Sequence, residues 1–196
     1  MNTEEIKPRF LERLAPYLVL LLIMLFGFAL RLYQLQYYLY VFEDSVWYIR
    51  TSMSFLNGEI LSPGATSKAP FFTSLLGLFF AIFGPTFSVS RSLSLLFGSL
   101  VPAPVYFLSS QFFGKRTGLL AAFIVAINPL LILYSCLPFR EALFWFTFTS
   151  CLFFALQGFK GNTVHSIVGG IFLALSMMTI EAGLLVSVGL LFYYLI

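Results

Sequence analysis

The sequence predicts an all-α, polytopic membrane protein, and three observations support this fold class. Hydrophobic residues make up 60% of the 196 positions and charged residues 10%, with a mean hydropathy of +0.95. A soluble domain carries about 25% charged residues, so this chain has too few to cover a water-facing surface. The apolar residues also gather in long runs, and a helix needs about 20 of them to cross a bilayer.

Four apolar runs are candidates for membrane-spanning helices: Tyr17–Leu32, Val89–Phe113, Gly118–Tyr134 and Ala142–Phe159. We interpret the first run as a signal anchor, because it is too long for a secretory signal and no small-residue cleavage site follows it. The run Ser166–Ile196 is too long for one span and is predicted to form two short spans that meet near Glu181. Pro102 and Pro104 should kink the second span, since proline lacks a backbone donor.

The segment Phe71–Phe83 is apolar but short, covering about 20 Å as a helix. Lys and Arg prefer cytoplasmic loops. If this segment spans the membrane, the pair Lys115-Arg116 falls outside; if it is re-entrant or interfacial, that pair and Lys160 join the basic N-terminus inside. Five acids that follow the first span then fall outside, namely Glu43, Asp44, Glu59, Glu141 and Glu181.

The second arrangement obeys the charge rule throughout, and we adopt it. It gives about six spans, with both termini inside and a single membrane domain over residues 1–196. The first external loop covers about residues 39–88 and contains the short apolar segment, and a second external loop covers Ser135–Glu141. The expected location is the cell membrane of a prokaryote or the endoplasmic reticulum membrane of a eukaryote, with the active face away from the cytoplasm.

Charge and cysteine content exclude several classes of function. The net charge is only +3 and no basic run is longer than Lys115-Arg116, which argues against a nucleic-acid partner. Cys136 and Cys151 stand in or beside apolar stretches, with no metal or disulfide spacing, so we expect both to be free. A glycine-rich phosphate loop is absent from the sequence, and the lone His165 is expected to flank a helix.

The external loop is predicted to contain an amphipathic helix over Ser45–Leu56 that lies on the membrane surface. Apolar residues recur there at helical spacing: Val46, Ile49, Met53 and Leu56. Asn57-Gly58 provides the usual C-terminal stop. Asp44 is expected at the N-terminal cap, where a carboxylate is also stabilised by the helix dipole.

Charged residues of both signs are expected on this external face: Glu43, Asp44, Lys68, Arg91 and Glu141. A carboxylate can accept a proton from an attacking hydroxyl or amine, and cations can stabilise negative charge on a departing phosphate. The set therefore suits transfer of a group from a lipid phosphate at the membrane surface.

Each of these residues also has a purely structural interpretation. Asp44 can serve as a cap, Lys68 as a snorkelling interfacial lysine, and Arg91 as an anchor at the end of a helix. Arg140 and Glu141 can neutralise each other at the surface. Four further charged residues are expected to be anchors or solvated charges: Arg31, Arg50, Glu59 and Glu181.

Five short motifs occur in a recognisable order along the chain. They are Asp44-Ser45-Val46-Trp47-Tyr48 with Asn57-Gly58, Ser67-Lys68-Ala69-Pro70, Phe83-Gly84 with Ser90-Arg91-Ser92-Leu93, the turn Phe113–Ala122, and Pro138-Phe139-Arg140-Glu141. In this order they resemble motifs of GT-C superfamily glycosyltransferases, above all the protein O-mannosyltransferases and the lipid A aminoarabinose transferases. The resemblance covers about residues 20–190.

The resemblance implies an inverting membrane enzyme that uses a polyprenyl- or dolichyl-phosphate sugar. It implies Asp44 as the catalytic carboxylate and Glu141 as a supporting acid, with Lys68 and Arg91 binding the lipid phosphate. Tyr48 and Arg140 lie inside the same motifs and are further substrate-binding candidates. Ser45 stands where many members carry Glu, so a second acid beside Asp44 would have to be Glu43.

These enzymes normally continue through more spans, so we expect this chain to be the N-terminal module of a longer protein. A non-catalytic, truncated membrane subunit or scaffold with the same fold is the main alternative, and an unrelated transporter is a third. The sequence lacks an Asp-x-Asp motif that would argue for a metal, and a divalent ion is left open. The sugar, the acceptor and the oligomeric state are not determined by these patterns.

Overall fold

The computed structural model describes residues 3–37, 42–58, 69–185 and 189–190, and these residues form helices and connecting turns without strands. The all-α prediction is confirmed for this part of the chain. The helices are α1 (Thr3–Leu35), α2 (Glu43–Leu56), α3 (Pro70–Phe83), α4 (Phe87–Leu100), α5 (Pro102–Ile127), α6 (Pro129–Ser135), α7 (Glu141–Gly158) and α8 (Thr163–Met177).

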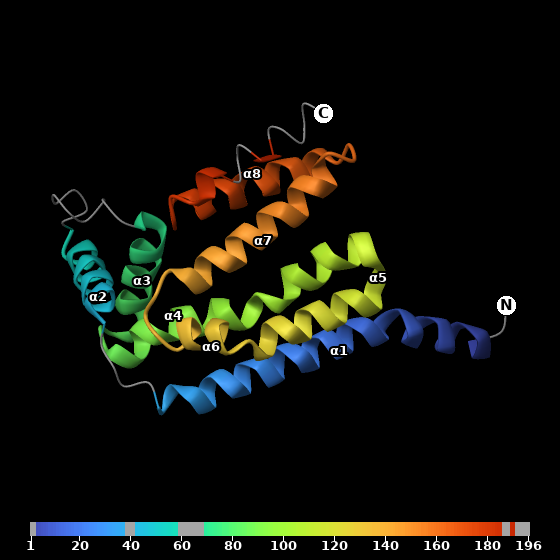
Figure 1. Ribbon diagram of the computed structural model, residues 1–196, viewed down its shortest axis with the longest axis horizontal. Helices are drawn as coiled ribbons and strands as arrows, with labels where there is room; N and C mark the ends of the chain where they lie inside the picture. Colours follow the sequence, from blue (N-terminus) through green and yellow to red (C-terminus); the bar gives the residue numbers. More distant parts are fainter. Residues whose placement is uncertain (1–2, 38–41, 59–68, 186–188, 191–196) are drawn as a thin grey trace.

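The long helices lie side by side, and the two short helices α2 and α3 gather at one end of them (Figure 1). The N-terminus lies at the opposite end. The closest pairings join α7 with α8, α1 with α5, and α2 with α3. Among the described residues, the stretches Leu14–Leu35 and Phe87–Ile127 are long and apolar enough to cross a membrane.

The second of these stretches is a hairpin, because α5 folds back on itself at Gly114. This residue has φ 82° and ψ 167°, a conformation that glycine adopts without the penalty of a Cβ atom. The two arms of α5 then pack closely at Gly118, where an added Cβ would lie 2.9 Å from the carbonyl oxygen of Tyr106. The turn expected around Lys115-Arg116 is therefore present, at the end opposite α2 (Figure 1).

Two proline residues divide the helical path into segments. Pro102 begins α5 after α4 ends at Leu100, and Val101 between them has helical angles, with φ −52° and ψ −38°. Pro104 lies inside the first turn of α5, and the kink expected at these prolines stays a prediction. Pro129 begins α6 after α5 ends at Ile127. A proline is tolerated at the first position of a helix, since that position has no intrahelical partner for a backbone donor.

The expected start of α2 needs correction. The N-terminal cap is Phe42, which has no side-chain capping bond, and Asp44 lies in the first turn of the helix beside Glu43. The carboxylates are stabilised there by the helix dipole. The cap is therefore the one expectation about α2 that is wrong. The face that packs against the protein consists of Ser45, Tyr48, Thr51 and Ser52, and the apolar stripe is exposed at Met53 and Leu56, so the surface location of this helix stays a prediction.

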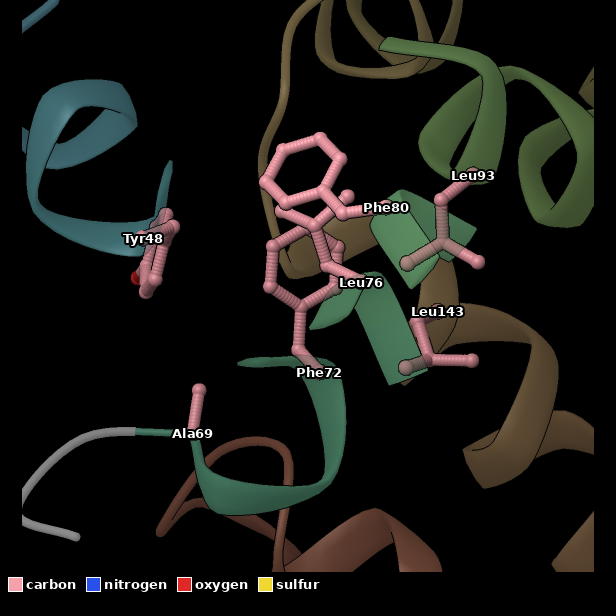
Figure 2. Packing of buried hydrophobic residues seen from close by; sticks show 7 residues of the cluster. All are labelled: Tyr48, Ala69, Phe72, Leu76, Phe80, Leu93 and Leu143. Carbon is pink, nitrogen blue, oxygen red and sulfur yellow. The ribbon is translucent and has the colours of Figure 1, made fainter. Parts of the chain in front are cut away.

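The buried cluster beneath α2 fixes the position of that helix. Tyr48 of α2 faces Phe72 of α3, with ring centroids 5.3 Å apart and an interplanar angle of 75° (Figure 2). Leu93 of α4 and Leu143 of α7 complete the cluster, and both are fully buried. The first turn of α7 and the short helices α2 and α3 therefore share one core.

Arg31 corrects a further expectation. This side chain is not a solvated anchor, because it is 0% exposed and lies between α1, α4 and the junction of α5 with α6. One terminal nitrogen, Nη1, donates to the carbonyl oxygen atoms of Gly27 at 2.9 Å and Ala126 at 3.1 Å.

A candidate active site at the α2 end of the molecule

The connection between α6 and α7 carries two candidate residues, Arg140 and Glu141, and it is held by α4. Arg91 Nε donates to the carbonyl oxygen of Cys136 at 2.7 Å. One turn later, the hydroxyl of Ser94 donates to the carbonyl oxygen of Phe139 at 2.8 Å and accepts from the Phe139 amide at 3.2 Å. The backbone just before Arg140 is therefore fixed at two points.

Arg140 and Glu141 are half-buried and present atoms that have no hydrogen-bond partner within the described residues. On Arg140 these atoms are Nε and Nη1, and on Glu141 the atom is Oε2. Ser45 Oγ of α2 is also buried without a partner. Buried polar groups in proteins are normally hydrogen-bonded, so Arg140 has donors and Glu141 an acceptor that are free to bind a ligand.

The pKa of the Tyr48 hydroxyl connects α2 to this cluster. Burial raises that pKa to about 12; the positive charge of Arg140 acts against the rise, and the negative charges of Glu141, Asp44 and Glu181 add to it. All four charged groups are therefore close enough to the hydroxyl to affect it. Asp44 and Glu141, almost a hundred residues apart in sequence, lie at the same end of the molecule.

The Glu141 carboxyl group has a raised pKa, chiefly because burial disfavours its charged form. A hydrogen bond from its own backbone amide and the charge of Arg140 oppose the rise, and Asp44 contributes to it. Glu141 precedes the expected span Ala142–Phe159. Perturbed carboxyl groups of this kind are common at functional sites.

A comparison with protein families adds to this geometry. The family model described as dolichyl-phosphate-mannose-protein mannosyltransferase matches residues 67–196. The chain belongs to this mannosyltransferase family. The match also supports the resemblance to GT-C glycosyltransferases over part of the chain. Neither a curated protein nor a solved structure matches the chain.

Membership of the mannosyltransferase family implies glycosyltransferase activity with dolichyl-phosphate-mannose as the donor. The matched residues include Arg91, Arg140 and Glu141. They begin after α2, so the placement of Asp44 and Tyr48 beside the matched part rests on the geometry of the fold and not on the family match.

Among the site residues predicted from the sequence, four lie at this end of the molecule, because their charges act on one another there: Asp44, Tyr48, Arg140 and Glu141. Glu43 is exposed in the same first turn of α2. Arg91 lies beneath the site with two of its nitrogen atoms bonded to backbone carbonyl oxygens. Lys68 lies outside the described residues.

Two residues of the site were missed by the sequence analysis. Ser45 was noted only as a departure from the family pattern, although its position three residues before Tyr48 places both side chains on one face of the helix. Glu181 was expected to be a solvated charge; it is exposed, yet close enough to influence Tyr48. The effect of the Glu181 charge on Tyr48 of α2 depends on the folded arrangement of the chain, and no sequence pattern indicates it.

In the described part of the chain, no group of three His, Cys, Asp or Glu side chains is placed to hold a metal ion. The cysteines expected to be free are free, and both are buried. The described acids are distributed over α1, α2, α7 and the turn after α8.

Proposed function

We propose that this chain forms the donor-binding part of a multi-pass membrane glycosyltransferase, which transfers mannose from a dolichyl- or polyprenyl-phosphate carrier to an acceptor on the non-cytoplasmic side. The observation that carries this proposal is the convergence of Asp44, Arg140 and Glu141 at one end of the helices, in a chain of the mannosyltransferase family.

The distribution of charge supports this orientation. The turn of α5 and the end of α7 lie at the end of the molecule opposite α2 (Figure 1). Exposed basic residues belong to these two segments, namely Lys115, Arg116 and Lys160. Lys160 Nζ lies 3.5 Å from Gln111 Oε1, so the α5 turn and the end of α7 meet there. Since basic residues favour the cytoplasmic side, the end with α2 and its acids would face away from the cytoplasm.

In the proposed reaction Asp44 acts as the general base. Its exposed carboxylate takes the proton from an acceptor hydroxyl, and the hydroxyl oxygen forms a bond to the anomeric carbon of mannose. The bond from that carbon to the phosphate oxygen breaks, and its electron pair leaves with the lipid phosphate. Attack from the face opposite the leaving group inverts the anomeric configuration.

Arg140 is the cation best placed to receive the leaving phosphate. Its Nε and Nη1 atoms are buried and have no partner within the described residues. A guanidinium group with two free donors can bind a phosphate in bidentate geometry. Arg91 would add positive charge from beneath the site. Lys68 is proposed as a further phosphate ligand from the sequence alone.

An apolar groove supports a long-chain lipid as the carrier. It has a volume of about 830 Å³ and contains a stripe on α7 that starts one turn after Glu141. The stripe consists of Phe144, Phe148, Leu152 and Leu156, and the facing wall includes Leu108 and Phe112 of α5. An isoprenoid chain in this groove would leave its phosphate near Arg140.

The test is transfer of labelled mannose from a dolichyl-phosphate donor by membranes that contain the chain. Asp44→Asn should lower the rate by roughly 10²–10⁴-fold, the usual contribution of a general base. Glu43→Gln, which removes the neighbouring charge, is the matched control and should retain most of the activity. Full activity of Asp44→Asn would exclude Asp44 from the mechanism, and donor binding without turnover by the unaltered chain would favour a non-catalytic subunit.

A further inference from the structure

Arg31 is a buried arginine without a carboxylate partner. It forms no ion pair within the described residues, and its Nε and Nη2 atoms have no hydrogen-bond partner there. A buried ionisable residue in an apolar helix normally has a function, with a partner that can be named. The partners of Arg31 are backbone carbonyl groups, and the more distant one is in Ala126, 95 residues away.

The Ala126 carbonyl needs this partner because the helix breaks beside it. In a continuous helix its oxygen would accept from the amide of Leu130. That amide instead donates to the Asn128 side chain at 3.0 Å, because Asn128 caps α6. Arg31 therefore supplies a donor to a carbonyl group that the break between α5 and α6 has released.

A second contact joins Arg31 to the candidate site. The Cys136 thiol donates to the Arg31 carbonyl oxygen at 3.4 Å, and the Cys136 carbonyl oxygen accepts from Arg91. Arg91 in turn donates to the Leu35 carbonyl oxygen at 2.6 Å, at the end of α1. These hydrogen bonds connect α1 with the residues on either side of α6, Ala126 and Cys136. Arg91 of α4 then joins Cys136 back to the end of α1.

The fit around this path is tight. Gly98 of α4 lies against both Arg31 and α6; an added Cβ would be 3.5 Å from Arg31 Nε and 2.7 Å from Ser135 Cβ. The free Nε atom of Arg31 therefore faces packed protein at α4, which favours a structural over a ligand-binding role for this guanidinium.

We propose that Arg31 is a positioning residue for the candidate site. Its side chain bonds to Ala126, shortly before α6, and so holds the start of α6 against α1, where the Arg31 backbone carbonyl accepts from Cys136 just after α6. Fixed in this way, α6 delivers Arg140 and Glu141 to the side of Asp44. What these residues do there rests on the proposed function, but the positioning itself does not.

The experiment measures local opening at Cys136. Cys136 and Cys151 are both fully buried in the same chain, so reaction with N-ethylmaleimide reports on two places at once. Arg31→Met should raise the labelling rate of Cys136 roughly tenfold or more while Cys151 stays protected, because local opening controls access to the thiol. Arg50→Met, the same change at an exposed arginine of α2, should change neither rate.

Hydrogen exchange and a conservative variant provide the second measurement. In Arg31→Met, amides of residues 136–141 should exchange faster while those of α8 do not. Arg31→Lys keeps a cationic donor and should restore much of the protection. If Arg31→Met leaves Cys136 and residues 136–141 protected, or exposes Cys151 equally, the positioning role is wrong. An inactive chain with the expected labelling pattern would contradict only the proposed function.

Discussion

Arg91 Nε donates a 2.7 Å hydrogen bond to the carbonyl oxygen of Cys136, 45 residues further along the chain. Its Nη2 atom donates to the carbonyl oxygen of Leu35 at 2.6 Å. The guanidinium thus binds carbonyl groups at the C-terminal ends of α1 and α6, where helices have free acceptors and attract positive charge. We therefore expect Arg91 to support the fold as well as any bound phosphate.

Removing this side chain should destabilise the protein measurably. Arg91→Met loses two charge-assisted hydrogen bonds, each worth about 1.5–3 kcal/mol, so unfolding in detergent should occur at a clearly lower temperature. Arg91→Lys can replace one of these bonds and should lose less. Arg116→Met, at an exposed position of the α5 turn, is the control. Equal melting temperatures for Arg91→Met and the control would contradict the structural role.

The contact between α4 and α6 depends on the absence of a side chain at Gly98. An added Cβ would lie 2.7 Å from Ser135 Cβ and closer still to Ser135 Oγ. Gly98→Ala should therefore cost about 1–3 kcal/mol of unfolding free energy through overpacking. The control is Gly170→Ala in α8, where nothing lies within 4 Å of the added Cβ, and this change should be neutral or stabilising.

A double substitution separates the clash from other effects of Gly98→Ala. Replacing Ser135 by Gly in the same chain removes both atoms that the new methyl group meets. The double variant Gly98→Ala with Ser135→Gly should recover part of the stability that Gly98→Ala loses, relative to Ser135→Gly alone. An absence of coupling between the two positions would place the cost elsewhere.

Glu141 should make stability depend on pH. Its pKa is raised in the folded state by burial, so the folded protein holds the proton more tightly than the unfolded chain does. The resulting stabilisation is fully present below the unfolded pKa of about 4.3 and is lost as pH rises through the higher folded pKa. Melting temperatures from pH 4 to pH 8 would record this loss.

The variant Glu141→Gln lacks the titrating group and should therefore lose less stability over the same pH range. Its melting temperature relative to the unaltered protein should rise as the pH increases. Glu43→Gln removes an exposed carboxylate of α2 and should retain the pH-dependent difference that Glu141 causes. A constant difference between Glu141→Gln and the unaltered protein across the pH range would argue against a raised pKa.

Much of the helical structure was predictable because apolar runs determine it locally, but the break at Asn128 inside the expected span Gly118–Tyr134 was not predicted. The short segment Phe71–Phe83 forms α3 with one additional residue, Pro70, and the turn at Gly114 lies where the motif Phe113–Ala122 indicated it. The start of α2 was predicted less well. An acid that precedes an apolar stripe can be the N-terminal cap of a helix or a residue of its first turn. The extended backbone of Phe42 makes Phe42 the cap and places Asp44 in the first turn.

The role of Arg31 could not be predicted, since its partner is a carbonyl group on another helix. The sequence does contain a partial signal: Asn128-Pro129 inside an apolar run marks a helix break, and a break releases carbonyl groups that need donors. Which donor reaches them depends on how α1 packs against α5. For the same reason, the proximity of Glu181 to Tyr48 became visible only in the folded chain.

The proposed topology can be tested with single cysteine substitutions on both sides of α3. Arg50 and Pro85 are exposed before and after this helix, and Arg116 is exposed at the opposite end of the molecule. If α3 does not cross the membrane, a membrane-impermeant maleimide applied to intact cells should label cysteine at positions 50 and 85. Cysteine at position 116 should react only after permeabilisation, because positive charge favours the cytoplasmic side.

The native thiols should contribute little background to this experiment, since Cys136 and Cys151 are buried. Labelling at 50 but not at 85 in intact cells would mean that α3 crosses the bilayer. Position 116 would then be reached from outside, and Glu141 would lie on the cytoplasmic side, opposite Asp44. Because the fold holds α2 and the first turn of α7 in one core, we expect positions 50 and 85 to react alike.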